Sequence, residues 1–500
     1  MNHNADLFLR KFFLIAILVI IGSISLACVS GDRASVGDDD GQDGGDDDTS
    51  DDDLNDDSDD DVDDDADDDF FDDDVDDDIN DDTDDDIDDD VDDDVDDDAD
   101  VENPTDEIGV FVSTGGDDAN PGTKAQPLRS IGAGVELAQS QGKWVFVAHG
   151  EYNETVNTPV SLYGGYTTSD WTRNYEDFPS TIIADRKAAV NIPTQGHNGV
   201  VVIEGFVLVG GILNFTSCAV EIFGGEVELN GNIIVGADVI TADSGTAESC
   251  GVIIHPGANA FVFGNYIQGG AAGASYLTVL SIGVNVQGEA TFYNNVIVSS
   301  DTYSVYGESR AVFVGYQASA LFINNQIFAG MVTGTSVGVE AYQTSYLVMS
   351  NNLIFGGAGL VSIGLNLGGE ALLVNNIILS GVGLAQAMAI NSGQDAQVTL
   401  QHNDLLSNGA LIETPYRTIT DIESVNRCNW LQCAESAGNI SAQALFVSEE
   451  DRHLAPGSPC IDAGGNPHTW IDLDLVDYDF DGDPRPWGAG WDIGSDEWTP

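Results

Sequence analysis

Gly288-Glu289-Ala290-Thr291-Phe292-Tyr293-Asn294-Asn295-Val296-Ile297 is one copy of a unit that repeats between about residues 222 and 410. In each copy a short apolar strand ends in asparagine, and a second strand containing Ile or Leu follows. The asparagine before the second strand recurs at Asn232, Asn265, Asn295, Asn325, Asn352, Asn376 and Asn403. The intervals are 33, 30, 30, 27, 24 and 27 residues. Self-similarity with a period of about 20 to 50 residues and short β-rich segments indicates a solenoid.

The repeated asparagine has a structural explanation. A tight corner between two strands needs a residue that tolerates the left-handed conformation, and Asn does so better than most residues. On rungs stacked about 4.8 Å apart, such amides hydrogen-bond to one another and to the backbone. We therefore interpret these asparagines as a structural ladder and not as ligands. Glu289 and Glu370 occupy equivalent turn positions, which favours solvated corners over catalytic acids.

The segment before the repeats resembles known proteins. The strand Val110–Val112 is followed by the turn Gly116–Thr123, and Pro127–Ile131 opens a helix-like segment that extends to about Gln139. This order resembles the opening of bacterial right-handed parallel β-helix proteins of the pectin-lyase-like superfamily. It is particularly similar to a family of unknown function in which the helix closes the first rung, an otherwise aggregation-prone edge.

The C-terminus also resembles a known module. Leu454–Gly464, Asp481–Pro486 and Asp492–Glu497 are similar to the segment that ends many such surface β-helix proteins. Together the two resemblances imply the fold. They imply no activity, because the family has none to transfer.

We therefore expect an all-β chain that forms a right-handed single-stranded parallel β-helix with an N-terminal helix cap over about 128–139. About ten rungs are expected between roughly 144 and 450. A disordered Asp-rich tether is expected to precede this body. The predicted domains are a lipoprotein signal peptide over 1–28, a linker over 29–103, the β-helix over 104–437 and a terminal module over 438–500.

The first residues are typical of an export signal. Arg10 and Lys11 precede the apolar run Phe12–Ile21, which is shorter than the about 20 residues of a membrane span. Leu26-Ala27-Cys28 then resembles the lipobox of bacterial lipoproteins, which implies lipidation of Cys28. An ordinary secretory signal with a chance cysteine is the alternative. We expect an exported lipoprotein of the outer membrane or cell surface, with the membrane as partner through its anchor.

The linker is dominated by aspartate. Residues 38–100 contain 42 Asp, about half of the 87 acidic residues in a chain of net charge −73. Self-repulsion and the lack of apolar surface prevent this segment from forming a core. It is either a solvated spacer or a calcium-binding ribbon, since clustered carboxylates are ligands for Ca²⁺. The rest of the chain is acidic too, which excludes nucleic acid as a partner.

The cysteines suggest oxidation after export. Five follow Cys28: Cys218, Cys250, Cys428, Cys433 and Cys460. Cys428 and Cys433 are close enough in sequence for a local bridge, and Cys218 and Cys250 lie about one solenoid turn apart. Cys460 would then remain free. The sequence does not settle the pairing.

One short acidic run suggests calcium. Asp477, Asp479, Asp481 and Asp483 alternate with other residues and include a glycine, as in the first half of a calcium loop. The glutamate expected at the twelfth position is absent, because that position is Gly488. The run is either a calcium site or an acidic solvated turn, and a calcium-binding structural protein is one functional alternative.

A polysaccharide lyase or glycoside hydrolase is a second alternative. β-Elimination needs a base and cations that neutralise a uronate. Between residues 200 and 400 the chain has one Arg, Arg310, no Lys, and one His, His255. A strongly negative body also repels a polyanionic substrate. Hydrolysis needs converging carboxylates at a set separation, and the sequence pairs none.

We favour a binding or structural module, and assign no catalytic residue. Stacked rungs present a regular face on which aromatic side chains offer platforms to a glycan or another cell-surface component. The candidate aromatic residues are Tyr303, Tyr306, Tyr316, Tyr342, Tyr346, Phe292 and Phe322. We expect the chain to act as a monomer.

Overall fold

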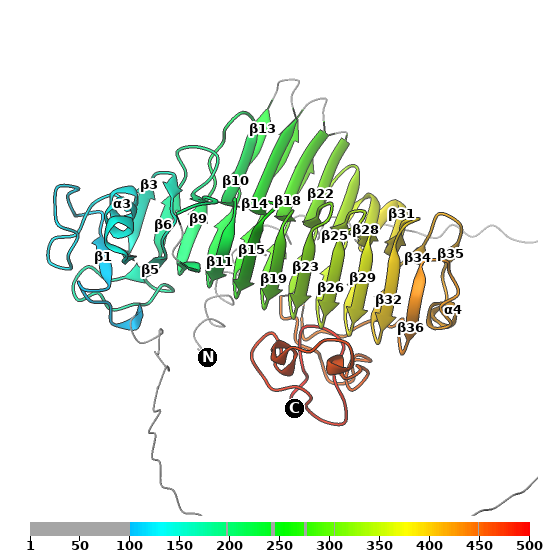
Figure 1. Cartoon of the computed structure of the whole chain (residues 1–500). Helices are drawn as coiled ribbons and strands as arrows, with labels where there is room; N and C mark the ends of the chain where they lie inside the picture. Colours follow the sequence, from blue (N-terminus) through cyan, green and yellow to red (C-terminus); the bar gives the residue numbers. More distant parts are fainter. Residues whose placement is uncertain (1–100, 197–198, 242–245, 275–277, 305, 449) are drawn as a thin grey trace, which may run out of the picture. The chain divides into compact units, whose positions relative to one another are not determined.

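The predicted parallel β-helix is confirmed by the computed structural model (Figure 1). The structure describes residues 101–196, 199–241, 246–274, 278–304, 306–448 and 450–500. The predicted signal peptide, Cys28 and nearly all of the Asp-rich linker lie outside these residues. No helix within the described ranges is long and apolar enough to cross a membrane.

Three long sheets run along the solenoid. Each full turn passes through sheet 1, then sheet 3, then sheet 2, and neighbouring strands of successive turns pair in parallel. Sheet 1 has twelve strands: β1 (Gly109–Val112), β2 (Trp144–Ala148), β5 (Leu162–Tyr166), β8 (Val201–Glu204), β11 (Gly225–Asn230), β15 (Ala258–Phe263), β19 (Glu289–Tyr293), β23 (Ser319–Ile323), β26 (Tyr346–Ser350), β29 (Glu370–Val374), β32 (Gln397–Gln401) and β36 (Cys433–Ala437).

Sheet 2 has eleven strands, of which the last two pair antiparallel. They are β4 (Val156–Asn157), β7 (Val190–Ile192), β10 (Thr216–Ile222), β14 (Ala247–Ile254), β18 (Thr278–Val286), β22 (Tyr306–Val314), β25 (Thr335–Ala341), β28 (Ala358–Leu367), β31 (Val382–Ser392), β34 (Ala410–Glu413) and β35 (Thr418–Ile419).

Sheet 3 has ten strands, one in each turn. They are β3 (Gly150–Asn153), β6 (Ser180–Ile183), β9 (Phe206–Val209), β12 (Ile233–Val235), β16 (Tyr266–Gln268), β20 (Val296–Val298), β24 (Gln326–Phe328), β27 (Leu353–Phe355), β30 (Ile377–Leu379) and β33 (Asp404–Leu406). A short fourth sheet contains β13 (Val239–Thr241), β17 (Ala272–Ala274) and β21 (Thr302–Tyr303).

The core lies inside the coil and is built from alternating apolar residues. Because side chains alternate between the two faces of a strand, every second residue of β19 and β23 points inward. Phe292 and Phe322 are fully buried there, and their rings stack with centroids 4.6 Å apart. The interpretation of these two residues as exposed sugar platforms is therefore wrong: they align on the inner face of sheet 1.

The asparagines form a continuous ladder at the corner between sheets 1 and 3. Asn265 is typical: its backbone N and its Nδ2 donate to Asn295 Oδ1 at 2.9 and 3.0 Å. Its Nδ2 also donates to the carbonyl of Leu229, one turn back, at 2.7 Å. The same pattern runs from Asn232 to Asn403 and continues to Asn439, where Asn403 Nδ2 lies 3.1 Å from Asn439 Oδ1. Each amide is almost completely buried with its hydrogen bonds made.

A second ladder, of serines, stabilises sheet 2. Ser217, Ser249, Ser281, Ser309, Ser336 and Ser362 occupy equivalent register positions and are buried. Ser281 Oγ, for example, donates to the carbonyl of Gly270 and accepts from the backbone N of Ser300, both at 2.9 Å. These hydroxyls thereby satisfy backbone groups in the connection that enters sheet 2.

The helix α3 (Ile131–Gln141) covers the first rung, as predicted. Ser130 caps its N-terminus, and Glu154 accepts from the backbone N of Ile131 at 2.8 Å and of Gly132 at 2.9 Å. A carboxylate at this end satisfies free N–H groups and opposes the helix dipole. At the far end, α4 (Ile422–Asn426) buries Val425 against the last turns.

Candidate functional site: a groove beside the C-terminal module

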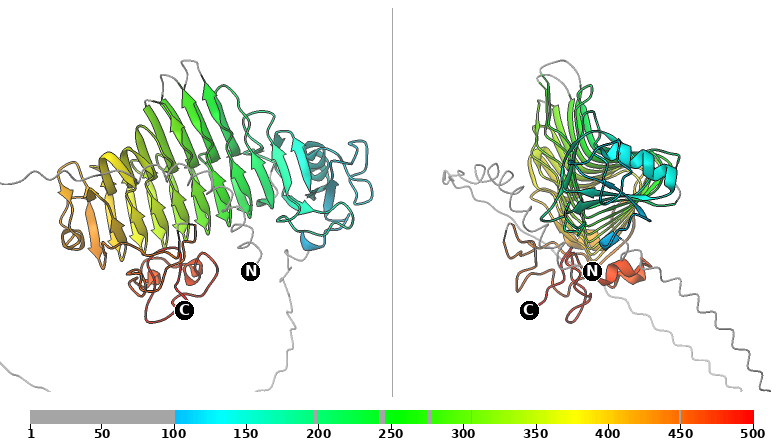
Figure 2. Two further views of the ribbon diagram at one scale, coloured as in Figure 1. Left: turned by 180° about the vertical axis from the view of Figure 1, so that it is seen from behind. Right: turned by 90° about the vertical axis from the view of Figure 1, so that its left-hand side faces the viewer.

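Residues 438–500, here called the C-terminal module, fold back along the middle of the solenoid (Figures 1 and 2). The helical elements among its described residues are the 3-10 turns η1 (Pro467–Thr469) and η2 (Asp474–Asp477). The module lies beside the corner of sheets 1 and 3, so it covers part of the outer face of sheet 1. Its placement decides where the solenoid surface stays open.

In the turns from Asn295 to Asn403, the residue before the ladder asparagine holds the module. These corner residues adopt left-handed φ angles, such as 55° at Asn375 and 54° at Asn324, so their side chains point outward. Asn375 pairs with the backbone of Gly465 through two hydrogen bonds of 2.8 Å. The other contacts join Asn294 to the carbonyl of Phe480 at 3.0 Å, Asn324 to that of Tyr478 at 2.6 Å, Asn351 to that of Asp492 at 3.4 Å, and His402 to that of Ala463 at 3.3 Å.

Apolar packing adds to this docking. Ile471 and Val476 of the module pack against Tyr293, Ile323 and Val348 on the outer face of sheet 1. A second contact joins buried module residues to sheet 3: Leu454, Cys460 and Ile493 pack with Leu353 and Ile377. The module is therefore held both by backbone hydrogen bonds and by buried apolar area, of which each Å² is worth about 25 cal/mol.

A buried ion pair organises the module itself. Arg485 and Glu497 lie 3.3 Å apart, and both side chains are 0% exposed. Arg485 also donates to the carbonyl of Gly494 at 2.9 Å. Asp492 accepts from the backbone N of Asp462 at 2.6 Å and of Trp498 at 2.7 Å. The charged residues of the C-terminal motif are thus framework residues that satisfy backbone groups.

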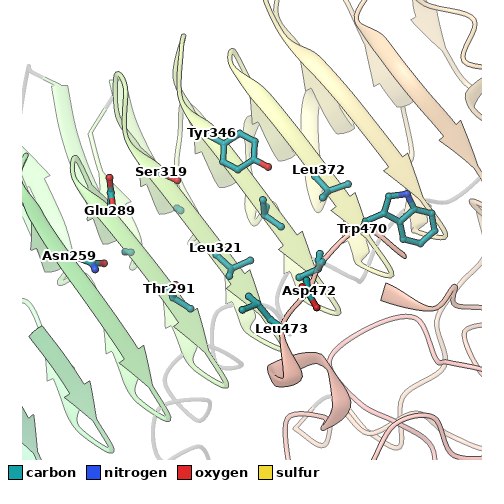
Figure 3. Close-up of a pocket in the computed structure, with 14 residues that line it drawn as sticks. Asn259, Glu289, Thr291, Ser319, Leu321, Tyr346, Leu372, Trp470, Asp472 and Leu473 are labelled. Atoms are coloured by element: carbon teal, nitrogen blue, oxygen red, sulfur yellow. The ribbon is translucent and has the colours of Figure 1, made fainter. Parts of the chain in front are cut away.

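A groove of about 300 Å³ remains between sheet 1 and the segment 470–473 (Figure 3). Its walls come from five neighbouring strands, β15 to β29, and from the module. On the sheet it is lined by Asn259, Glu289, Ala290, Thr291, Ser319, Ala320, Leu321, Tyr346, Val348 and Leu372, and on the module by Trp470, Ile471, Asp472 and Leu473. In Figure 3, Asp472 and Leu473 of the C-terminal segment lie beside the sheet, and Trp470 lies at the Leu372 end of the groove.

Strand register determines the chemistry of the groove. Asn259, Glu289, Ser319 and Tyr346 are paired residues on successive strands, so they form one outward polar row with an aromatic ring at its end. The parallel row two residues later carries Thr291, Leu321, Val348 and Leu372 and is apolar beyond its first member. Tyr346 is 44% exposed. The groove thus combines an apolar floor, two aromatic rings and hydrogen-bonding groups.

The groove is acidic. Glu289 and Asp472 are both solvent-exposed, and no Lys or Arg lines the groove. Arg310, on β22, is instead bound to Glu308 at 2.7 Å and to Glu340. An acidic groove disfavours uronate-containing polymers and favours neutral or positively charged ligands.

The four aspartates that suggest calcium have separate partners. Asp477 pairs with His468 at 2.7 Å and Asp481 with His453 at 2.6 Å. Asp479 is buried; it accepts from the backbone N of Asp481, Asp483 and Glu497, and burial raises its pKa. Asp483 is exposed. Asp479 therefore organises the turn, and we see no shared coordination by the four carboxylates.

The cysteines pair as two bridges. The structure joins Cys218 to Cys250, paired residues of β10 and β14, and Cys428 to Cys433. Cys460 is the unpaired cysteine among those described; it is buried under the module, with its Sγ 3.5 Å from Asp404 Oδ2. Burial raises the pKa of the Cys460 thiol, so it is not a reactive thiolate.

Most of the predicted aromatic platforms are exposed but scattered. Tyr303, Tyr306, Tyr316 and Tyr342 are at least half exposed and belong to strands or connections of sheet 2 and the short fourth sheet. Only Tyr346 lies in the groove. Trp470 was not among the predicted platforms, because nothing local in the sequence places residue 470 beside strands more than 90 residues earlier.

Comparisons with known proteins find one matching family model and several solved structures. A family model described as "Protein of unknown function (DUF1565)" matches residues 114–163, which include α3, β2 and the start of the first turns. None of the curated proteins matches the sequence.

Among solved structures, a pectate lyase is 12% identical, with a TM-score of 0.47 over 78% of this chain and 98% of its own. The complex of XylC with xylose is 10% identical, with a TM-score of 0.38 and the same coverages. A rhamnogalacturonan lyase is 13% identical, with a TM-score of 0.33 over 68% of this chain and 91% of its own. The parallel β-helix follows from the strand pairing of the chain itself, and no activity transfers at these similarities.

Proposed function

We propose that this chain is an exported, lipid-anchored surface protein whose solenoid binds a neutral or amine-bearing glycan in the groove. The observation that carries the binding role is the groove itself, where Tyr346 and Trp470 flank an apolar floor with hydrogen-bonding groups along one edge. Ligand sites are typically concave, apolar and aromatic, with a few polar groups that fix orientation. The volume of about 300 Å³ lies at the small end of such sites, which fits one or two sugar rings.

The acidity of the groove narrows the ligand class. Glu289 and Asp472 line it with no basic residue to balance them, so a uronate chain would be repelled. Neutral sugars can donate hydroxyl hydrogens to these carboxylates, and an amino sugar would add a charge-assisted hydrogen bond. This distinguishes the proposal from binding of acidic polysaccharides.

A glycan array followed by titration calorimetry tests binding. Trp470→Ala and Tyr346→Ala should each weaken the best ligand at least about tenfold, a loss of about 1.4 kcal/mol. Tyr416→Ala is the matched control, because Tyr416 is 64% exposed and does not line the groove. The array should favour neutral or amine-bearing sugars. A failure to bind any glycan, or equal losses for all three variants, would contradict the proposal.

Hydrolysis of the bound glycan is the second candidate, because Glu289 and Asp472 both line the groove. Glycosidases use such a carboxylate pair, one member of which stays protonated through an environment that raises its pKa. Both carboxylates are solvent-exposed here, which argues against that role. Mass spectrometry of a polysaccharide panel decides the matter: products formed by the wild type and lost in Glu289→Gln would establish an enzyme.

Export and anchoring have their own support. The two disulfides, Cys218–Cys250 and Cys428–Cys433, fit an oxidising compartment. Leu26-Ala27-Cys28 after an apolar run supports lipidation at Cys28, and the Asp-rich segment supports a spacer between anchor and solenoid. Cys28→Ala should abolish labelling by a fatty-acid probe and release the protein from membranes, whereas a labelled, membrane-bound variant would rule out this anchor.

A further inference from the structure

The strongest unexplained feature outside the groove is a cluster of His453, Asp481 and Asp496 within the C-terminal module. Each of the three offers a ligand atom, and these atoms all lie within 4.8 Å of one another. Among the described residues this is the one group of its kind that contains at least three His, Cys, Asp or Glu side chains. The cluster is separate from the residues that line the groove.

The local fold brings these three residues together for identifiable reasons. Asp479 accepts from the backbone N of Asp481 at 2.9 Å and of Asp483 at 2.8 Å, which fixes the turn that carries Asp481. The backbone N of Phe480 donates to the carbonyl of Ser495 at 2.9 Å, so Asp481 and Asp496 lie on adjacent segments. The backbone N of Val447 donates to the carbonyl of His453 at 2.9 Å, which fixes the backbone that carries the imidazole.

Asp496 is the residue that a purely structural account explains least. Its side chain belongs to a residue that is 7% exposed, yet the hydrogen bond recorded for its carboxylate is the one to Oδ2 from the backbone N of Leu454, at 2.6 Å. A buried carboxylate normally has charged or multiple hydrogen-bonding partners. Its charged neighbours are His453, which attracts it, and Asp479 and Asp481, which repel it. A cation would offset this concentration of negative charge.

The histidine is held in the orientation that a metal ligand needs. Its Nε2 lies 2.6 Å from Asp481 Oδ2, facing the cluster. Its Nδ1 faces the other way and hydrogen-bonds to Asp451 Oδ1. A carboxylate that holds one ring nitrogen while the other binds a metal is a recurring arrangement at zinc sites. His468 differs: its Nε2 pairs with Asp477, and no third ligand group joins them among the residues that the structure describes.

We propose that His453 Nε2, Asp481 and Asp496 bind one divalent transition-metal ion, of which Zn²⁺ is the natural choice, with Asp451 orienting the imidazole. Imidazole favours zinc and similar metals, whereas calcium prefers sites made of oxygen ligands alone. Three protein ligands leave a coordination position for water. The ion would join the segment that carries His453 to the turn at 479–483 and to the tail at 496, and so cross-link the module.

The experiment must separate this site from the polyaspartate segment, which will also attract cations. Co²⁺ is the probe, because a four-coordinate histidine site absorbs visible light much more strongly than the hydrated, octahedral ion that a carboxylate polyelectrolyte condenses. The full chain should show a saturable cobalt spectrum at one equivalent, which one equivalent of Zn²⁺ abolishes. Zn²⁺ should also raise the melting temperature of the full chain.

Matched variants locate the site. His453→Gln and Asp496→Asn should each abolish the cobalt spectrum, and Asp451→Asn should weaken Zn²⁺ about 10- to 100-fold, the usual effect of losing the group that orients a ligand. His468→Gln, in the same module, should change neither. If His453→Gln does not fold by circular dichroism, Asp451→Asn and Asp496→Asn decide the question alone.

Two results would overturn the proposal. The first is cobalt and zinc binding that never saturates and is equal in the wild type and all variants, which would leave the tether as the sole binder. The second is saturable binding of Ca²⁺ that Zn²⁺ does not displace. Neither result bears on glycan binding in the groove, since that site shares none of these residues.

Discussion

Two stretches of the same solenoid differ at one residue of each corner. At Gly231 and Gly264 the residue before the ladder asparagine is glycine, with φ of 60° and 64°. From Asn294 to Asn375 it is asparagine at nearly the same φ, and each side chain hydrogen-bonds to the C-terminal module. The corner conformation is therefore common to both stretches. The two stretches differ in the corner residue, which is asparagine where the module is contacted and glycine where it is not.

The comparison of the two stretches shows that the two asparagines of each pair have different roles, which the sequence pattern does not distinguish. The second asparagine of each pair is buried in the ladder and is needed in every turn, covered or not. The first asparagine is an outward docking group in the covered stretch and is dispensable elsewhere. If the two roles are separate, substitutions in the module, in the ladder and at the corners should affect the two stretches differently.

Removing the buried guanidinium group of Arg485 should cause the largest loss of stability. Arg485→Leu leaves Glu497 buried without its partner, which costs about 3–5 kcal/mol. Hydrogen exchange should then accelerate at the corners from Asn294 to Asn375 and stay unchanged at Gly231 and Gly264. Arg427→Leu is the control, because its pair with Glu423 is 72% and 76% exposed and should contribute less than about 1 kcal/mol. Equal acceleration along the whole solenoid would contradict the comparison.

The second effect is a dependence of the free energy of unfolding on pH, which arises from Asp404. Asp404 is fully buried, and desolvation raises its pKa from 3.8 to about 6. Between these pH values the folded state binds the proton of Asp404 more tightly than the unfolded state. The folded state is therefore more stable with Asp404 protonated, at low pH, than with Asp404 ionised, at high pH. That contribution declines as the pH rises from about 4 to about 6 and stays lost above it.

Asp404→Asn removes this titration while it keeps an acceptor for the backbone N of Ala442, which lies 2.9 Å from Asp404 Oδ1. Urea denaturation should show a variant about 2–3 kcal/mol more stable than the wild type at pH 7.5, and nearly equal to it at pH 4. Asp395→Asn, at an exposed turn, serves as control. A constant difference at both pH values would show that Asp404 does not titrate as described.

The third effect should be the same in both stretches. Asn325→Val leaves its backbone and amide partners without hydrogen bonds, at a cost of about 1–3 kcal/mol. Asn265→Val, at a corner the module does not cover, should cost a similar amount, because its ladder contacts are equivalent. The midpoints of urea unfolding give the comparison. A loss at Asn325 alone would mean that the ladder depends on the module.

The smallest effects come from exchanging the corner residues. Asn375→Gly removes two hydrogen bonds to Gly465, worth together about 1–2 kcal/mol. Gly264→Asn should change stability by no more than about 0.5 kcal/mol, because a Cβ there meets no atom within 4 Å. Thermal unfolding of both variants measures the difference, and equal losses would show that the corner asparagine acts on the backbone and not through the module.

From the sequence we predicted the features that repeat along the chain and missed those formed by residues far apart in the sequence. Asn325 and its equivalents recur at near-constant intervals, so periodicity predicted the solenoid and its ladder, and the resemblance of the two ends of the chain specified the parallel β-helix. The register of Ser281 and its equivalents was also visible as a recurring Ser followed two residues later by Gly or Ala, and it escaped because serine is common. The groove is lined by both Tyr346 and Trp470, which are more than 100 residues apart in the sequence and are linked by no periodic signal. Likewise, Asp481 suggested a metal, but its partners His453 and Asp496 lie outside the acidic run that drew attention to it.

The groove lies where the C-terminal module covers sheet 1. A hydrogen-exchange footprint of the protein with the best-bound oligosaccharide tests most directly whether the groove binds the glycan. We expect added protection in β19, β23 and β26 and in residues 470–473, with none at Gly231 or along sheet 2. Protection confined to sheet 2 or to the short fourth sheet would contradict the assignment of the groove as the binding site.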